Sequence, residues 1–172
     1  FDVSIWVEAM SGISRELQKL YPGWANYIIQ NEINYRSELE ELHNFCITHI
    51  NKISKDQRVM VTAHDAFKYF GRAYAIKVRG LQGISTTAEY GLQDVTELVN
   101  FISDHKIKAL FVESSVPKRS IEAVIEGCKS KGHPIKLGGE LFSDAMGEAG
   151  TPEGTYVGMV RHNVNTTVEA LK

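Results

Sequence analysis

The feature that most constrains the fold is the alternation of strand-like and helix-like segments from residue 58 onward. Four short apolar runs have the composition of strands, at residues 58–62, 77–84, 109–113 and 134–137. Helical patterns follow each of them, at residues 65–74, 92–105, 118–131 and 155–171. Strands that alternate with helices favour a parallel sheet covered on both faces. The sequence therefore predicts an α/β fold with a parallel four-stranded sheet and helices on both faces.

Two long amphipathic segments precede this alternation. Apolar residues recur at helical spacing over residues 3–20, and Pro22 and Gly23 interrupt the pattern. The pattern resumes from about residue 23 to residue 53, which predicts a helix about 45 Å long at 1.5 Å per residue. Because this is more than twice the mean helix length, we expect a helix that links two bodies or packs along a whole domain.

Composition narrows the classes of function. The chain has 172 residues, of which 43% are hydrophobic and 23% charged, close to the average of globular domains. A formal net charge of −2 gives no reason to expect nucleic acid or an anionic membrane surface as a partner. No apolar run approaches the length that crosses a bilayer, and no signal-like segment is present. Since the chain starts at Phe1 without a methionine, we expect a processed form or a fragment.

The two cysteines, Cys46 and Cys128, lie far apart in the sequence. They give no support to a cysteine-based zinc site, and we expect both to be small apolar core residues. Whether they pair stays open at this point.

Polar side chains follow three of the predicted strands. His64 comes after the first strand, Glu113 ends the third, and Asp144 lies in a glycine-rich loop, residues 138–154, after the fourth. In parallel α/β sheets, ligands bind at the carboxyl ends of the strands. One imidazole with one or two carboxylates suits Zn²⁺, Mn²⁺ or Fe²⁺. The sequence therefore makes His64, Glu113 and Asp144 candidates for a metal site.

Each candidate also has an ordinary structural explanation. His64 and Asp65 could cap the following helix, Glu113 could be satisfied by backbone amides, and Asp144 could serve a turn. The remaining histidines are not predicted as ligands: His43, His49, His105, His133 and His162.

Nucleophilic catalysis and phosphate binding find little support. Ser114 and Ser115 follow a strand, but the sequence has no Gly-x-Ser-x-Gly elbow. It has no Walker motif and no Gly-x-Gly-x-x-Gly fingerprint either.

An ordered series of motifs carries a family resemblance. Residues 61–70 read Val-Thr-Ala-His-Asp-Ala-Phe-Lys-Tyr-Phe, and Ala-Tyr follows at residues 73–74. Further motifs come in order: Gly-Ile-Ser-Thr at residues 83–86, Phe-Val-Glu at 111–113, Leu-Phe-Ser-Asp at 141–144 and Gly-Thr-Pro-Glu-Gly-Thr-Tyr at 150–156. Together they resemble the metal-binding solute-binding lipoproteins of bacterial zinc, manganese and iron ABC transporters.

The resemblance implies a metal site shared between two lobes, each of which supplies two ligands. It implies His64 and Asp144 as the ligands of the C-terminal lobe, and it leaves Glu113 as a residue that orients His64 through its free ring nitrogen. It further implies that residues 1–22 are a remnant helix of the N-terminal lobe, that 23–53 link the lobes, and that 54–172 form the C-terminal metal-binding lobe. The other two ligands would precede Phe1, so the chain would hold half the site.

The resemblance also implies a receptor rather than an enzyme. Such a receptor lies in the periplasm or on the outer face of the cytoplasmic membrane. It captures a divalent zinc, manganese or iron ion and delivers it to an ABC permease, with the missing N-terminal lobe as a further partner. Two alternatives stay open at this point: a metal-dependent α/β hydrolase with Glu113 as general base, and a metal-free surface interaction domain. The sequence does not choose the metal, the oligomeric state or the pairing of the cysteines.

Overall fold

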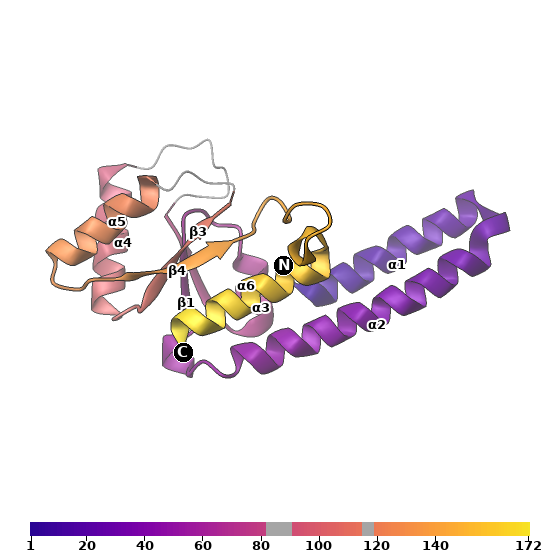
Figure 1. The fold of residues 1–172 in the computed structure, drawn as a ribbon, viewed down its shortest axis with the longest axis horizontal. Coiled ribbons are helices and arrows are strands. Elements are labelled where there is room, and N and C mark those ends of the chain that lie inside the picture. Colours follow the sequence, from indigo (N-terminus) through magenta and orange to yellow (C-terminus); the bar gives the residue numbers. More distant parts are fainter. Residues whose placement is uncertain (82–90, 115–118) are drawn as a thin grey trace.

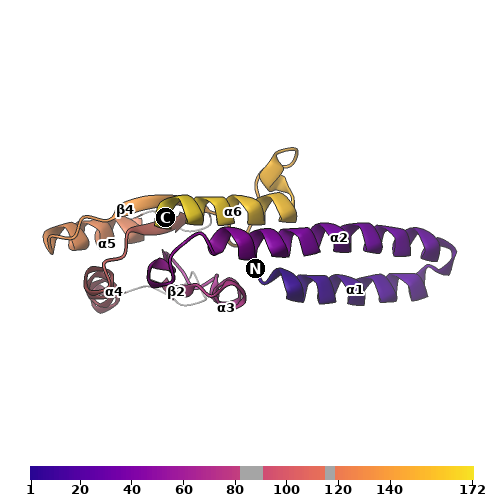
Figure 2. The same cartoon turned by 90° about the horizontal axis from the view of Figure 1, so that it is seen from below.

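A helical hairpin projects from an α/β body in the computed structural model, which describes residues 1–81, 91–114 and 119–172 (Figure 1). Helix α1 (Val3–Leu20) and helix α2 (Ala25–Ile50) run antiparallel and are joined by the 3-10 turn η1 (Pro22–Trp24). Both views show the two helices side by side, with their connecting end remote from the body (Figure 2). The proline and glycine that interrupt the sequence pattern lie in this turn.

The body contains the predicted alternation of strands and helices. Its elements, in chain order, are η2 (Lys55–Gln57), β1 (Val59–Thr62), α3 (Lys68–Tyr74), β2 (Lys77–Gly80), α4 (Leu92–Asp104), β3 (Ala109–Glu113), α5 (Arg119–Ser130), β4 (Lys136–Leu141), η3 (Pro152–Gly154) and α6 (Tyr156–Leu171). The end of the predicted strand at residues 77–84, and the motif at 83–86, lie outside the described residues. The same holds for Ser115.

The strands form two parallel ladders rather than one continuous sheet. β1 pairs with β2, and β3 pairs with β4; β1 packs beside β3. Every residue of β1 and β3 is buried, whereas β2 and β4 contain exposed positions, as expected of central and edge strands. The parallel α/β class is confirmed, and the single four-stranded sheet is only approximate, because no registered ladder joins β1 to β3.

Helices cover both faces of the strands, as predicted. Along β3, Ala109 and Phe111 belong to the core cluster formed with α2, α3 and α6. Leu110 and Val112 belong to a second cluster formed with α4 and α5. This is the alternation of side chains that a strand imposes. Cys46 lies in the first cluster and Cys128 in the second, both buried and free.

The prediction of a strand at residues 134–137 and a loop from 138 was wrong at their boundary. β4 runs over Lys136–Leu141 and includes Gly138 and Gly139. A Cβ atom at Gly138 would lie 2.7 Å from the Phe111 ring and 2.9 Å from Ala170. Gly139 has a φ of +126°, a conformation open mainly to glycine. Close packing of β4 on β3 and α6 therefore accounts for glycines that the sequence alone suggested were loop residues.

Helix α2 is shorter than the predicted 23–53 segment, and its burial is uneven. Its buried residues, Leu39, Leu42, Cys46 and Ile50, all lie in its second half, which packs against α6. Its first half packs mainly on α1. Among the helices of the described residues, none combines the length and the apolar composition of a membrane-spanning segment.

Candidate metal centre

His64 lies in the short segment between β1 and α3 and is only 2% exposed. Its backbone N–H donates to Glu113 Oε1 at 2.9 Å, and its carbonyl oxygen accepts from the Thr62 hydroxyl at 2.7 Å. These bonds hold the backbone where β1 ends, so the imidazole projects from the carboxyl end of the strand.

The capping explanation for His64 and Asp65 is wrong. Helix α3 begins at Lys68, its N-cap is Phe67, and no side chain caps it. Asp65 instead forms an ion pair with Lys68. The helix begins later than the predicted residue 65 because the intervening residues form the turn that presents His64.

Glu113 ends β3 and is 1% exposed. Its Oε2 atom lies 2.5 Å from His64 Nδ1, although neither atom makes a hydrogen bond of standard geometry. Its carboxylate also interacts with the Ser143 hydroxyl. Glu113 therefore contacts both the segment that carries His64 and the loop that carries Asp144.

The electrostatic setting of Glu113 is mixed. Burial raises the pKa of the Glu113 carboxyl above its ordinary value, while hydrogen bonds from the His64 amide and the Ser143 hydroxyl act in the opposite direction. A buried carboxylate is costly unless partners compensate it. Here the segment that carries His64 and the loop that carries Asp144 both supply partners. The alternative explanation for Glu113, that a backbone amide satisfies its carboxylate, also holds. The amide that donates to it is that of His64.

Asp144 approaches His64 from the other side. It follows β4 in the loop before η3, its side chain is 57% exposed, and its Oδ2 atom lies 3.7 Å from His64 Nε2. The two imidazole nitrogens thus face two carboxylates, a buried one at Nδ1 and an exposed one at Nε2.

The three candidate residues do not make a complete metal site. Within the described residues, no group of three or more His, Cys, Asp or Glu side chains is arranged to hold a metal ion. Glu113 contacts Nδ1 of His64, on the other side of the ring from Asp144, so His64 Nε2 and Asp144 make at most a pair of ligands. A tetrahedral site needs four.

Two residues near the centre were not singled out from the sequence. Ser143 connects Glu113 to the loop, and Asn163 of α6 forms two hydrogen bonds with the backbone of Phe142. Asn163 had a detectable signal, since it is a polar residue within the apolar pattern of α6, between Val160 and Val164. Ser143 had none.

The other histidines each have a local partner. Their ring nitrogens lie within hydrogen-bonding distance of the Tyr74 hydroxyl for His43 and of backbone carbonyl oxygens for His49, His105, His133 and His162.

Comparison with known proteins gives a family match over nearly the whole chain. The model of the family described as ZnuA, zinc-uptake complex component A, periplasmic, matches residues 1–170. The manganese-binding lipoprotein MntA of Bacillus subtilis is 50% identical over 172 residues, which are 100% of this chain and 56% of the relative. The zinc-binding protein TroA of Treponema pallidum is 46% identical over 99% of this chain and 56% of its own length.

A solved structure of the periplasmic zinc-binding protein TroA from Treponema pallidum has the same fold. It superposes with a TM-score of 0.96 at 46% identity, over 99% of this chain and 62% of that one. The chain therefore spans little more than half the length of the relatives it matches.

Proposed function

The chain belongs to the ZnuA family of periplasmic metal-uptake components, and on that premise we propose that it is part of a receptor that captures a divalent transition metal ion and delivers it to an ABC permease. Relatives are named as zinc-binding and manganese-binding proteins, and as periplasmic proteins or lipoproteins. We propose zinc, manganese or iron as the cargo, and the periplasm or the outer face of the cytoplasmic membrane as the location.

The observation that carries this proposal is the pairing of His64 Nε2 with Asp144 Oδ2 at 3.7 Å. Two ligands of one tetrahedral zinc ion, with bonds of about 2.0–2.2 Å, lie about 3.4 Å apart. A metal ion between these atoms would therefore need only a small adjustment of the exposed Asp144 side chain. Glu113 beside Nδ1 favours the tautomer with the proton on Nδ1, which leaves the Nε2 lone pair for the metal.

We propose that the other ligands come from the part of the longer protein that this chain lacks. Residues 1–22 would belong to an N-terminal lobe, 23–53 would link the lobes, and 54–172 would be the C-terminal lobe. An apolar groove between α1 and α2 supports this division, because large side chains face solvent there. It is lined mainly by Met10, Ile13, Leu17, Tyr27, Ile28 and Tyr35. Exposed apolar surface of this kind marks a contact with another body.

We propose capture rather than catalysis. The hydrolase alternative needs Glu113 as a general base in contact with a reacting water. That carboxylate is 1% exposed and is engaged by the amide and ring of His64. Its position suits it to orient the imidazole.

Titration of the 172-residue chain with Zn²⁺ and Mn²⁺ tests the proposal. We expect weak binding, because two protein ligands leave water to complete the coordination sphere. His64→Ala should abolish it, and Asp144→Asn should weaken it markedly, because His64 Nε2 would remain as a ligand. The matched controls are His105→Ala and Asp104→Asn, which alter exposed residues at the end of α4.

Anomalous scattering from a metal-soaked crystal would locate the ion. Metal between His64 and Asp144 supports the assignment. Metal at another position, or binding that survives both substitutions, contradicts it.

A further inference from the structure

Asn163 is a buried polar side chain that coordinates nothing in the proposed site. It lies on α6, is 3% exposed, and is flanked by the core residues Val160 and Val164. A buried amide is unfavourable unless its donor and acceptor are both satisfied. Its partners therefore show what it contributes.

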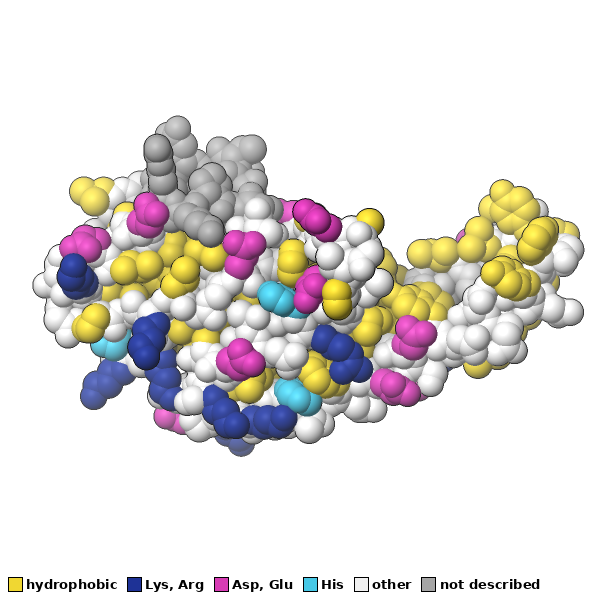
Figure 3. Space-filling view, in the orientation of Figure 1, with side chains coloured by type: hydrophobic (Ala, Val, Ile, Leu, Met, Phe, Trp, Pro, Cys, Tyr) yellow, Lys and Arg dark blue, Asp and Glu magenta, His cyan; other side chains and the backbone are white. Residues whose placement is uncertain are grey.

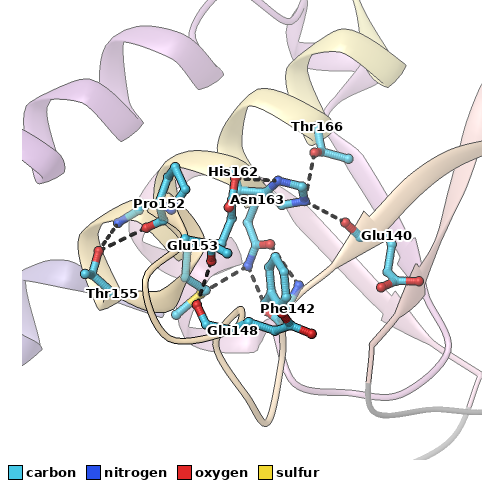
Figure 4. Close-up of polar contacts among 12 residues, drawn as sticks. Glu140, Phe142, Glu148, Pro152, Glu153, Thr155, His162, Asn163 and Thr166 are labelled. Atoms are coloured by element: carbon cyan, nitrogen blue, oxygen red, sulfur yellow. Dashed lines mark hydrogen bonds and ion pairs between the residues drawn. The ribbon is translucent and has the colours of Figure 1, made fainter.

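Both the oxygen and the nitrogen of the Asn163 amide bind Phe142. This residue opens the loop that carries Asp144, residues 142–151, which we call the ligand loop. The Phe142 N–H donates to Asn163 Oδ1 at 2.9 Å, and Asn163 Nδ2 donates to the Phe142 carbonyl oxygen at 2.8 Å (Figure 4). The side chain thus pairs with Phe142 as a neighbouring strand would. A weak contact of 3.5 Å joins Nδ2 to Met159 Sδ.

These bonds hold the chain where β4 ends and the ligand loop begins. Leu141 is the last residue of β4, and only Ser143 separates Phe142 from Asp144. The two hydrogen bonds set the peptide planes on both sides of Phe142. They therefore limit the direction that the backbone can take at the next two residues. Asp144 has a mostly exposed side chain, so its own packing does little to fix it.

His162, the residue before Asn163, makes further contacts at both ends of the same loop. His162 Nε2 lies 3.0 Å from the Glu140 carbonyl oxygen, and its Nδ1 lies 3.8 Å from Glu153 Oε1 (Figure 4). The His162 ring also packs edge-to-face on Phe142, with centroids 5.1 Å apart. Successive residues of α6 thus hold the start of the loop, but only Asn163 bonds the backbone of Phe142 through its side chain.

We propose that Asn163 is a positioning residue for Asp144, and that its buried amide sets the approach of this carboxylate to His64. The inference rests on the proposed metal-binding function of Asp144. Asparagine suits the task because one side chain supplies both an acceptor and a donor. Aspartate at this position would lose the donor, and leucine would lose both groups while keeping the same branching at Cγ.

The test is a double-mutant cycle on the 172-residue chain, with Zn²⁺ affinity measured by competition against a chromophoric chelator. The cycle combines Asn163→Leu with Asp144→Asn. We expect Asn163→Leu to weaken Zn²⁺ binding about 10-fold, the lower end for residues that orient metal ligands. In the Asp144→Asn background its effect should fall below about twofold, because nothing is left to position.

Matched variants separate positioning from general damage. Asn165→Leu makes the same change at an exposed position of α6 and should leave the affinity unchanged. Thr167→Val removes a buried hydroxyl that bonds within the helix, to the Asn163 carbonyl oxygen, and should lower stability without changing affinity. If Asn163→Leu does not fold, Asn163→Ser takes its place in the cycle.

An equal loss of affinity in both backgrounds, or no loss at all, overturns the inference. If Asp144→Asn itself leaves the affinity unchanged, it is the proposed role of Asp144 that fails. Two readouts without metal then decide on Asn163: amide exchange of Phe142, and the His64–Asp144 distance in a crystal of the variant. Faster exchange with a changed distance supports positioning, and an unchanged loop refutes it.

Discussion

At the scale of single residues, His64 stands between two carboxylates in different surroundings. Glu113 is 1% exposed and accepts from the His64 backbone with one oxygen while the other faces the imidazole. Asp144 is open to solvent and faces Nε2. In the proposed function, Glu113 orients the ring and Asp144 captures the metal ion, because the exposed carboxylate can exchange water for an ion.

Glu113→Gln should weaken metal binding about 10-fold or more. Both oxygens of Glu113 face N–H groups of His64, whereas glutamine offers one acceptor, so an NH₂ group would face a donor. Competition titration with Zn²⁺ measures the loss. The control is Glu122→Gln, on the exposed side of α5, and equal affinities of the two variants would contradict the role of Glu113.

Cys46 should make stability depend on pH in alkaline solution. Burial raises the pKa of the Cys46 thiol from 9.0 to about 11. The unfolded thiol therefore ionises first as pH rises above 9, and the free energy of unfolding falls until the folded thiol ionises as well. At about pH 10.5 the loss due to this group is about 2 kcal/mol.

Urea unfolding of the wild type and of Cys46→Ala, at about pH 8 and about pH 10.5, checks this expectation. The alanine variant should be less stable at the lower pH, because a buried side chain is truncated, but it should lose less on going to the higher pH. Parallel losses in the two proteins would show that the thiol does not contribute.

At the scale of elements, the backbone of the turn before α6 and of the start of that helix is packed so closely that two glycines there have no room for a Cβ atom. A Cβ atom at Gly158 would lie 1.7 Å from the Pro152 carbonyl oxygen, and one at Gly154 would lie 2.3 Å from that of Glu148. Thr155 caps α6 by accepting from the Gly158 N–H at 3.1 Å. The loop that carries Asp144 is therefore anchored at both ends, by Asn163 at its start and by these glycines at its end.

Two glycines in helices should respond to alanine in opposite directions. Gly158→Ala should destabilise the protein by about 1–3 kcal/mol, because backbone must move to admit the methyl group. Gly12→Ala in α1 meets nothing within 4 Å, so it should stabilise by about 0.5–1 kcal/mol through helix propensity. Thermal or urea unfolding measures both, and stabilisation at both positions would argue against the tight turn.

At the scale of the whole molecule, the body and the hairpin differ in how their apolar surface is used. The body buries its strands between two helical layers. The outer part of the hairpin leaves large side chains exposed, among them Ile13 at 58%, Trp24 at 64% and Tyr27 at 63%. Figure 3 shows hydrophobic side chains gathered at the free end of the hairpin.

The isolated chain should therefore self-associate at high concentration through this surface. Ile13→Lys should reduce the association and cost little stability, because the side chain is 58% exposed. Sedimentation velocity over a range of concentrations measures it. The control is Leu92→Lys on α4, where the side chain is 85% exposed and lies outside the hairpin; identical effects of the two variants would count against a role for the hairpin surface.

Several features of the molecule could be predicted from the sequence because they depend on neighbours along the chain. The continuous apolar runs that form β1 and β3 identify buried strands, and apolar spacing identifies the helices. The positions of His64, Glu113 and Asp144 after predicted strands pointed to the carboxyl ends of the strands as the candidate site, and the family resemblance implied His64 and Asp144 as the ligands. The weaker predictions were boundaries: the start of α3, where no side chain caps the helix, and β4, where glycines continue the strand.

Contacts between distant segments were decided only by the tertiary structure. His64 and Glu113 are 49 residues apart, and their distance depends on β1 packing beside β3. The bond between Asn163 and Phe142 depends on α6 folding back over β4. Local patterns specify which face of an element is apolar, but not which partner covers it, because many arrangements bury the same surface. Strand order and close packing select one of them, and with it the neighbours of each polar side chain at the centre.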